Sequence, residues 1–445
     1  MKVLVVIGCQ WGDEGKAKVI DHVFDSGYTD CDGVNYGGAK LVFRYQGGAN
    51  AGHTQVTTDG KKIISHTVPS GVTRKGVYNL LMPGVVIIPD VLIGEIDGFN
   101  SSETVITPDN FGIGGRVGIT LECHRLEDGW KGGSSINADL GTTKMGIGPT
   151  YTDRARRIGV NFAEFLNEDS FRRALDRNKE KSGRDFEIDR YLKMYAGYRN
   201  RLAPFLVDEA DALDRYAGDI AIAEGAQGIM LDGENGSYPF VTPSSPVRLP
   251  VDASHRMGVV KAYTTRVGEG PMPTELGDPQ QINTDRPDQR LTEEETRRAL
   301  DGDELLMGRL LRLKGGEFGA TTGRPRRCGW FDAALVRYAV KIGGIDNVVL
   351  TKLDVLSRIP KLQVCTKYEL AGVPTGIPMD RFGWYGLEPV FEELPGWEGD
   401  IRSARMFGDL PKEGRGYVDF VEAAIGRHID LISIGPKGEE TIVRK

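Results

Sequence analysis

The fold is decided by a stretch near the start of the chain, residues 3–18, which reads VLVVIGCQWGDEGKAK. Its first five residues are valine, leucine or isoleucine, and they predict a buried strand. Three glycines follow at positions 8, 12 and 15, and Lys16 then opens a helical pattern. Glycines let backbone N–H groups approach phosphate oxygens, a helix N-terminus favours anions, and a lysine adds positive charge. The stretch therefore predicts a strand, a phosphate-binding turn and a helix.

The turn is P-loop-like but departs from the usual pattern at its end. In a P-loop a Ser or Thr follows the lysine and coordinates Mg²⁺, whereas Ala17 and Lys18 stand here. Another residue must then hold the metal, and Asp13, which lies inside the turn, is the natural candidate.

Short β-branched runs recur between helical patterns along the rest of the chain. They are residues 3–7, 41–45, 79–82, 220–223 and 347–351. Continuous apolar strands that alternate with helices are typical of a parallel sheet covered on both faces. The predicted fold class is therefore α/β, with a mostly parallel central sheet and helices on both faces.

Two stretches read as additions to this sheet. Residues 162–217 interleave charged and apolar residues at helical spacing and predict a helical excursion. Residues 277–298 are rich in Asp, Glu, Gln, Pro and Thr and predict a polar surface insertion. No repeat, low-complexity tract or linker divides the sequence, so we expect one elaborated domain over residues 1–445.

Composition excludes several classes of function. The net charge of −7 is unlike that of proteins that bind nucleic acid broadly. No apolar run of about 18 residues is present to span a membrane. The five cysteines are scattered and form no C-x-x-C pair, which favours neither a disulfide framework nor a zinc site. We expect a soluble protein of the reducing cytoplasm.

A second loop carries acid–base chemistry. Residues 46–54 read QGGANAGHT and follow the predicted strand that ends at Tyr45. A lone loop histidine is more often a surface residue, but His53 follows one predicted strand and Asp13 follows another. Loops after parallel strands converge at the carboxyl edge of the sheet, where open α/β folds bind ligands. His53 can donate a proton near neutral pH, and we predict that it lies opposite Asp13.

Three further stretches are suited to nucleotides and small dianions. Thr351-Lys352-Leu353-Asp354 follows a predicted strand; a carboxylate there can bind N1–H and the 2-amino group of guanine, and the stem of Lys352 can lie over the ring. Guanine, rather than adenine, offers that donor pair. Residues 141–149 and 319–327 combine glycines and threonines, and the second adds arginines, a set suited to aspartate or a nucleotide phosphate.

Taken together, these residues resemble the adenylosuccinate synthetase family from Val3 to about Pro436. The matching motifs are QWGDEGK, NAGHT, EGAQG (224–228), YPFVT (238–242), KAYTTRVGEGP (261–271), GATTGR (319–324), TKLD (351–354) and PGW (395–397). The resemblance implies a GTP-dependent ligase fold and a two-step reaction. A base at Asp13 removes the N1 proton of IMP while the 6-oxygen attacks the γ-phosphate of GTP, and the amine of L-aspartate then displaces phosphate.

The resemblance also implies roles for individual residues. Asp13, His53, Gln227 and Lys16 would be catalytic, with His53 as general acid and Gln227 orienting the 6-oxo group. Mg²⁺ would contact Asp13 and the carbonyl of Gly52. The implied GTP-binding residues are Gly12, Glu14, Gly15, Lys16, Ala17, Lys18, Lys352, Asp354, Ser433 and Gly435. Those for the substrate nucleotide are Asn50, Thr143, Arg157, Gln227 and Thr242, with Arg157 reaching across a homodimer interface. L-Aspartate would be held by Thr321, Thr322, Arg324 and Arg326.

The sequence departs from the family pattern at several places. Ala17 replaces a glycine, and Met145 and Pro325 replace arginines. Residues 243–252 read PSSPVRLPVD where members carry a Gly- and Thr-rich loop. This loop leaves open the same reaction on a 2-aminopurine nucleotide such as dGMP, as in the 2-aminoadenylosuccinate synthetases, although those relatives often replace the base and prefer ATP. A guanine-nucleotide switch is a further alternative, but it gives His53, Gln227 and Arg324 no role.

Overall fold

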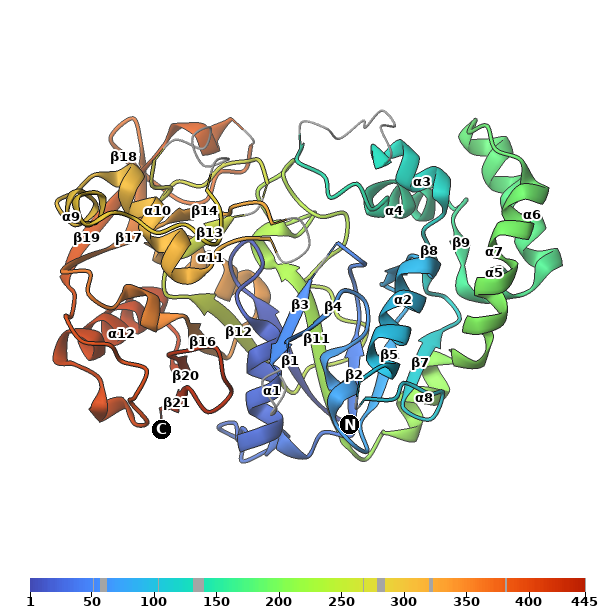
Figure 1. Ribbon diagram of the computed structural model, residues 1–445, viewed down its shortest axis with the longest axis horizontal. Helices are drawn as coiled ribbons and strands as arrows, with labels where there is room; N and C mark the ends of the chain where they lie inside the picture. Colours follow the sequence, from blue (N-terminus) through green and yellow to red (C-terminus); the bar gives the residue numbers. More distant parts are fainter. Residues whose placement is uncertain are drawn as a thin grey trace.

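The computed structural model describes residues 1–50, 52–56, 62–102, 104–130, 140–266, 268–277, 285–319, 323–380 and 382–444, and for 53–56, 62 and 63 the main chain alone. At its centre lies one large twisted sheet (Figure 1). Its strands, in order across the sheet, are β10 (Leu206–Val207), β7 (Phe111–Gly114), β5 (Tyr78–Leu81), β2 (Leu41–Arg44), β11 (Ile220–Gly228), β1 (Lys2–Gly8), β12 (His255–Lys261), β16 (Asn347–Thr351), β20 (Ile429–Ser433) and β21 (Thr441–Val443).

Neighbouring strands are parallel from β10 to β20, and β21 pairs with β20 in the antiparallel direction. All five strands predicted from β-branched runs belong to this sheet, which confirms the predicted fold class. The strands run from the lower edge in Figure 1, where both termini lie, so their carboxyl ends meet the loops at the upper edge. Strand β11 continues past Ala223 to Gly228 and thereby carries Gln227 to that edge.

Helices cover both faces of the sheet. Alternate residues of β1 point to opposite faces: Val3, Val5 and Ile7 join the core that includes α11 and α12, and Leu4 and Val6 join the core that includes α1. The helices are α1 (Lys16–Ser26), α2 (Pro89–Asn100), α3 (Glu122–Glu127), α4 (Ile147–Ala155), α5 (Phe162–Leu166), α6 (Glu168–Ser182), α7 (Ile188–Leu202), α8 (Glu209–Arg215), α9 (Glu293–Leu300), α10 (Glu304–Gly315), α11 (Ala333–Gly343) and α12 (Lys412–Ile425).

Strand β12 was missed from the sequence because its first half, His255-Arg256-Met257-Gly258, is polar and contains a glycine. It nevertheless lies in the middle of the sheet between β1 and β16. A Cβ on Gly258 would stand 2.6 Å from the Sγ of Cys9, so close packing requires glycine there. Lys261 ends β12 at the carboxyl edge.

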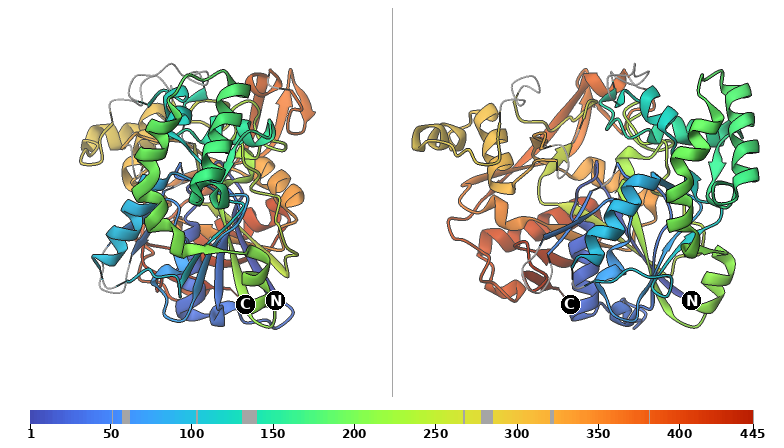
Figure 2. Two further views of the ribbon diagram at one scale, coloured as in Figure 1. Left: turned by 90° about the vertical axis from the view of Figure 1, so that its right-hand side faces the viewer. Right: turned by 45° about the vertical axis from the view of Figure 1, so that its right-hand side comes forward.

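The predicted helical excursion contains α5, α6, α7 and α8. Aromatic residues of α5, α6 and α7, among them Phe165, Phe171 and Tyr195, pack with residues of α2 and β7 in a second hydrophobic core. The chain then returns through a short 3-10 helix (Ala203–Phe205) to the edge strand β10. Figure 2 shows α6 and α7, in green, at one end of the molecule and α9, in gold, at the other.

The polar stretch 277–298 lies partly outside the described residues, which resume at Asp285. That residue is not on the surface: it is 5% exposed and pairs with Arg309 and Arg312 of α10. Helix α9 then begins at Glu293, capped by the side chain of Thr292. The described part of the insertion is therefore anchored on α10 by a buried carboxylate.

Shorter strands complete the structure around the upper loops. Strand β3 (His53–Val56) pairs with β4 (Lys62–Ser65) in the antiparallel direction, and β6 (Val86–Ile87), β8 (Gly118–Ile119) and β9 (Val160–Asn161) form a small sheet. Strand β13 (Thr264–Arg266) pairs with β14 (Arg327–Gly329), and β15 (Phe331–Asp332), β17 (Lys361–Leu370), β18 (Val373–Thr375) and β19 (Leu387–Pro395) form a further sheet. Helix α1 packs against β3, which brings the phosphate turn close to the second loop.

Candidate active site at the carboxyl edge of the sheet

The predicted phosphate turn links β1 directly to α1. Gly12, Asp13 and Gly15 have positive φ angles of 88°, 60° and 93°. Gly15 is the N-cap of α1 in the left-handed conformation, which a residue with a Cβ adopts with strain. Gly8 is needed for a different reason: a Cβ there would lie 2.2 Å from the Oε2 atom of Glu14. The chain thus folds back in a tight turn between β1 and α1.

The carboxylate of Glu14 lies inside this turn rather than on its surface. Its Oε1 atom accepts hydrogen bonds from the N–H groups of Gln10 at 3.1 Å and Gly12 at 2.8 Å. Its Oε2 atom accepts from the Nζ of Lys16 at 2.9 Å, and both side chains are buried. Glu14 therefore neutralises Lys16 and fixes the shape of the turn.

Lys16 also joins the turn to the end of β11. Its Nζ donates to the carbonyl of Gln227 at 2.7 Å. Gln227 has a positive φ of 55°, and its Nε2 donates to the Oδ1 of Asn50 at 3.3 Å. The Oε1 atom of Gln227 is buried and has no hydrogen-bond partner among the described residues. Three predicted site residues from three separate loops are therefore in contact.

Asp13 faces the loop predicted to bind aspartate. Its Oδ2 atom lies 2.9 Å from the Nε of Arg326, and about a third of the Asp13 side chain (34%) is exposed. Burial alone would raise the pKa of Asp13, but Arg326, Lys261 and Lys16 outweigh it and hold the pKa below its usual range. Asp13 is therefore ionised at neutral pH, in the form that accepts a proton.

Lys18, which replaces the Ser or Thr of a P-loop, binds another turn of the protein. Its Nζ donates to the Oγ of Ser433 at 2.5 Å and to the carbonyls of Gly435 and Glu440. Burial lowers the pKa of Lys18 to about 8. The Lys18 side chain thus ties α1 to the turn that follows β20, and the neighbouring Ala17 is buried in the core.

Lys352 and Asp354 lie at the carboxyl end of β16, as predicted. Lys352 has a positive φ of 59°, and its Nζ donates to the carbonyl of Gly315 and to the Oε1 of Glu317, each at 2.7 Å. Asp354 lies in a short 3-10 helix, Leu353–Leu356. Burial raises the pKa of Asp354, although Lys18 and Lys352 lower it in part. The carbonyl of Gly435 accepts a hydrogen bond from Lys18, which also interacts electrostatically with Asp354.

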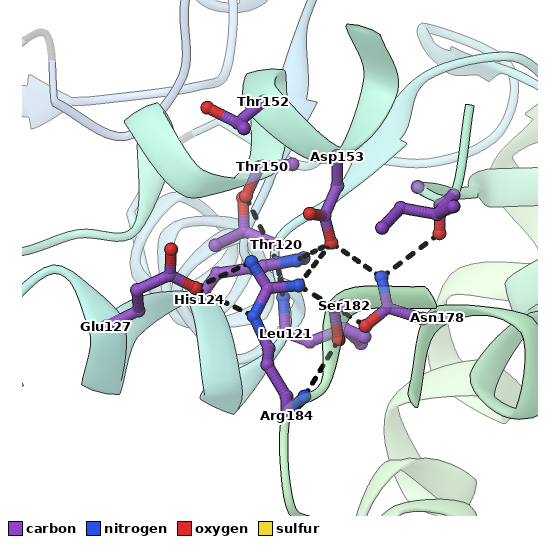
Figure 3. A network of polar contacts seen from close by, with 12 residues as sticks. Thr120, Leu121, His124, Glu127, Thr150, Thr152, Asp153, Asn178, Ser182 and Arg184 are labelled. Carbon is purple, nitrogen blue, oxygen red and sulfur yellow. Dashed lines mark hydrogen bonds and ion pairs between the residues drawn. The ribbon is translucent and has the colours of Figure 1, made fainter. Parts of the chain in front are cut away.

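Two predicted nucleotide residues flank helix α4. Thr143 precedes the helix and Arg157 follows it with a φ of 63°, and both are exposed. Below them, a buried polar network fixes α4 against α3 and the excursion (Figure 3). Its centre is the Oδ2 atom of Asp153, which contacts His124 at 2.9 Å, Arg184 at 2.5 Å and Asn178 at 2.5 Å. The main-chain carbonyl of Asp153 accepts from the N–H groups of residues 158 and 159, which shapes the turn that carries Arg157.

The divergent loop 243–252 is held by side-chain contacts. The hydroxyl of Thr242 lies 3.2 Å from that of Ser244, which donates to the Oε1 of Gln46 at 2.8 Å. Ser245 donates to Asp232, and the carbonyl of Pro246 accepts from Tyr45 at 2.6 Å. The proline-rich segment is therefore docked on the loop that leads to Asn50.

Several predicted residues cannot be placed by their side chains. Thr321 and Thr322 lie outside the described residues. The main chain of His53 begins β3 and pairs with Ser65, but its side chain is not described. Gly52, next to His53, is partly buried. Arg324, in the loop predicted to bind aspartate, is exposed. Met145 is partly buried before α4.

Two buried charged residues of this site, Lys261 and Glu317, were not predicted from the sequence. Both are fully buried, and they form an ion pair at 2.8 Å. The signal for Lys261 was present, because the residue opens the KAYTTR motif at the end of a strand. Glu317 precedes the GATTGR motif and gave no pattern of its own.

The described ranges are also informative about metal binding and membrane spanning. They hold no group of three or more His, Cys, Asp or Glu side chains placed to bind a metal ion. None of the helices in them is long and apolar enough to cross a bilayer.

Comparison with known proteins gives a consistent result. The family model described as adenylosuccinate synthetase matches residues 5–442. The adenylosuccinate synthetase of Caldanaerobacter subterraneus subsp. tengcongensis is 37% identical over 100% of this chain and 99% of its own length. That of Geobacter sulfurreducens is 39% identical, over 100% and 98%.

Two solved structures resemble the chain. Fully ligated adenylosuccinate synthetase from Plasmodium falciparum matches with a TM-score of 0.83 and 30% identity over 100% of both chains. The succinoaminodeoxyadenylate synthetase of cyanophage S-2L, bound to dGMP and dATP, matches with a TM-score of 0.59 and 18% identity over 99% of this chain and 95% of that one. At that identity the second likeness shows the fold alone.

Proposed function

Because the chain belongs to the adenylosuccinate synthetase family, we propose that the loops at its carboxyl edge join L-aspartate to the 6-position of IMP at the expense of GTP. The products are adenylosuccinate, GDP and phosphate. The observation that carries the assignment of residues is the contact between Asp13 and Arg326 at 2.9 Å. This contact supports a shared site for the proposed base and a proposed aspartate ligand.

In the first step, the Asp13 carboxylate accepts the N1 proton of IMP while the 6-oxygen attacks the γ-phosphorus of GTP. The bond between that phosphorus and the bridging oxygen breaks, and GDP leaves. In the second step, the amine of L-aspartate attacks C6 and loses a proton, and phosphate leaves with the former 6-oxygen. Phosphorylation is necessary because an amide-like oxygen is a poor leaving group. The ionised state of Asp13 supports its role as the base.

The other side chains bind and orient the reactants. Lys16, which is held by the carbonyl of Gln227, would bind the triphosphate and place positive charge where negative charge develops. Gln227 would orient the 6-oxo group by donating to it from Nε2, which in the structure donates to Asn50 at 3.3 Å. His53 is the proposed general acid. Asn50, Thr143 and Thr242 would bind the 5′-phosphate of IMP, and Thr321, Thr322 and Arg324 would bind L-aspartate beside Arg326.

The oxygen atoms of Asp13 and Gly52 are suitable ligands for Mg²⁺, as the family resemblance implies. Asp13 offers a partly exposed carboxylate and Gly52 a main-chain carbonyl, both of them hard oxygen ligands. Mg²⁺ commonly takes one or two protein oxygens and completes its shell with phosphates and water, so a dedicated cluster of acids is unnecessary. When bound, the ion would neutralise charge on the transferred phosphoryl group.

We expect a substrate panel to show activity with IMP and GTP and with neither GMP nor dGMP. The purified protein would be mixed with L-aspartate, Mg²⁺ and each pair of nucleotides, and phosphate release would be measured. Retained Asp13 and the TKLD motif favour IMP and GTP. Activity confined to dGMP or GMP would overturn the choice of IMP, and GTP hydrolysis independent of L-aspartate would instead favour a nucleotide switch.

We further propose a homodimer in which Arg157 of each subunit reaches the partner's nucleotide site. Its exposure, beyond a helix that the Asp153 network holds in place, supports this role. Two inactive variants, Asp13→Asn and Arg157→Leu, should then complement each other when mixed. Random exchange makes half of the dimers hybrid, each with one intact site of two, so about a quarter of the wild-type turnover should return.

Sedimentation at the assay concentration would show whether the mixed species is a dimer. Absence of complementation in a mixture that sediments as a dimer would contradict the reach of Arg157 into the partner's site.

We place the reaction in the cytoplasm, which agrees with five free cysteines, four of them buried.

A further inference from the structure

Glu317 occupies an unusual position for a carboxylate. Its side chain is 0% exposed. Its Oε1 atom accepts hydrogen bonds from the hydroxyl of Tyr263 at 2.5 Å and the Nζ of Lys352 at 2.7 Å. Its Oε2 atom accepts from the Nζ of Lys261 and the Nη1 of Arg326, each at 2.8 Å. One buried carboxylate therefore faces three cations and a phenol.

These partners come from separate parts of the chain that meet at the carboxyl edge of the sheet. Lys261 ends β12, and Tyr263 lies two residues beyond it. Lys352 follows β16 and belongs to the guanine end of the site. Arg326 belongs to the loop predicted to bind aspartate and carries the ion pair with Asp13. Glu317 thus contacts one residue from each of two substrate subsites.

The main chain fixes Glu317 firmly enough to act as an anchor. Helix α10 ends at Gly315, and its C-cap residue Gly316 has the left-handed conformation. The N–H of Glu317 then donates to the carbonyl of Arg312 at 2.8 Å, and its carbonyl accepts from the N–H of Arg326 at 2.9 Å. Glu317 is consequently bonded to Arg326 through both its main chain and its side chain.

The charges of the cluster explain what the carboxylate does there. Lys261, Lys352 and Arg326 face the two carboxylates of Glu317 and Asp13, which leaves one net positive charge at the site. Burial alone would raise the pKa of Glu317, but the three cations hold it well below its usual range. Without this negative charge the cations would repel one another in a buried place, and long side chains would turn to other partners.

We infer that Glu317 is a positioning residue that sets Arg326 for L-aspartate and Lys352 for GTP, so that these two subsites depend on one buried carboxylate. The inference rests on the proposed function. Glu317 touches no substrate itself and acts through the two cations. Gln227 and Asn50, which belong to the proposed IMP side, form no hydrogen bond or ion pair with Glu317 among the described contacts and should be little affected.

The chain offers a matched control in Glu275. Its carboxylate forms a similar, largely buried pair with the adjacent arginine, Arg327, whose Nε lies 2.7 Å from Oε1. Arg327 is bonded to Arg326 along the chain, but the described side-chain hydrogen bonds and ion pairs of the Glu275–Arg327 pair involve none of the site residues named above. Loss of one buried acid–arginine pair can therefore be compared with loss of the other.

The experiment measures KM for L-aspartate, GTP and IMP separately in Glu317→Gln, Glu275→Gln and the wild type. Glutamine keeps the shape of the side chain but removes its charge. In Glu317→Gln we expect KM for L-aspartate and for GTP each to rise about tenfold, the size of effect expected for a lost charged hydrogen bond, with KM for IMP within about twofold of wild type. Glu275→Gln should change none of the three substantially.

Equal increases for all three substrates, or a loss of kcat alone, would overturn the inference. If Glu317→Gln fails to fold, as judged by circular dichroism, Tyr263→Phe removes one hydrogen bond to Oε1 without changing charge. It should raise KM for L-aspartate and GTP by a few-fold, and unchanged values would count equally against the inference. A wild type without aspartate-dependent phosphate release would contradict the proposed function instead.

Discussion

Replacing Asp13 with asparagine should lower kcat by about 10²- to 10⁴-fold, the usual contribution of a positioned acid or base. Asparagine has nearly the same shape but cannot accept the N1 proton of IMP. The carboxylate is ionised in the structure because Arg326, Lys261 and Lys16 outweigh the effect of burial, so the base form is available at neutral pH. GTP should still bind, because the backbone amides of the turn and Lys16 remain in place.

The measurement is steady-state phosphate release together with GTP binding by calorimetry. The control is Asp109→Asn. Asp109 is exposed and precedes the amino end of β7, away from the carboxyl edge of the sheet, so this variant should behave as wild type. Turnover near the wild-type rate in Asp13→Asn would mean that another group removes the proton. Loss of GTP binding would mean instead that the substitution deformed the turn.

Replacing Lys16 with methionine should reduce kcat/KM for GTP by about 10²-fold. Charged hydrogen bonds contribute about 1.5–3 kcal/mol, and preorganised charge at a transferring phosphoryl group contributes at least as much. Lys16 is held in place before any ligand binds, by Glu14 at 2.9 Å and the carbonyl of Gln227 at 2.7 Å. Methionine fills the same volume without the charge.

Two observations would separate a catalytic loss from a structural one in this variant. The methionine variant leaves the buried carboxylate of Glu14 without its cation, so thermal unfolding should be followed alongside kinetics. Lys75→Met removes an exposed lysine elsewhere and should leave both quantities unchanged. A folded Lys16→Met protein with normal kcat/KM for GTP would contradict the proposed role of the lysine.

Local patterns were enough to predict the elements that carry the site. The run Val3–Ile7 alternates between the two faces of the sheet, and the glycines after it could form only a tight turn before a helix. Polar β12 escaped prediction because its place in the sheet comes from pairing with β1 and β16, which no local pattern reveals. Asp285 was misread as surface for a similar reason: its partners on α10 lie further along the chain.

Contacts between side chains of loops that are distant in the chain could not be predicted from the sequence. Lys18, Ser433 and Gly435 were each predicted to bind GTP. The structure shows in addition that the ammonium group of Lys18 binds Ser433 and the turn after it, some 400 residues away, and no local pattern reveals that contact. Arg326 and Asp13 were assigned to different substrates, and the structure brings them into one ion pair.

The sequence by itself determined the α/β class and the tight turn after β1, and it supplied the proposed nucleotide and aspartate ligands, because these follow from local conformation and side-chain chemistry. Tertiary structure alone decided which of those groups meet. The parallel sheet brings the ends of β1, β11, β12 and β16 to one edge, and a carboxylate as uninformative in sequence as Glu317 becomes the common partner of three cations there. Burial and long-range pairing, which set its charge environment, exist only once the chain has folded.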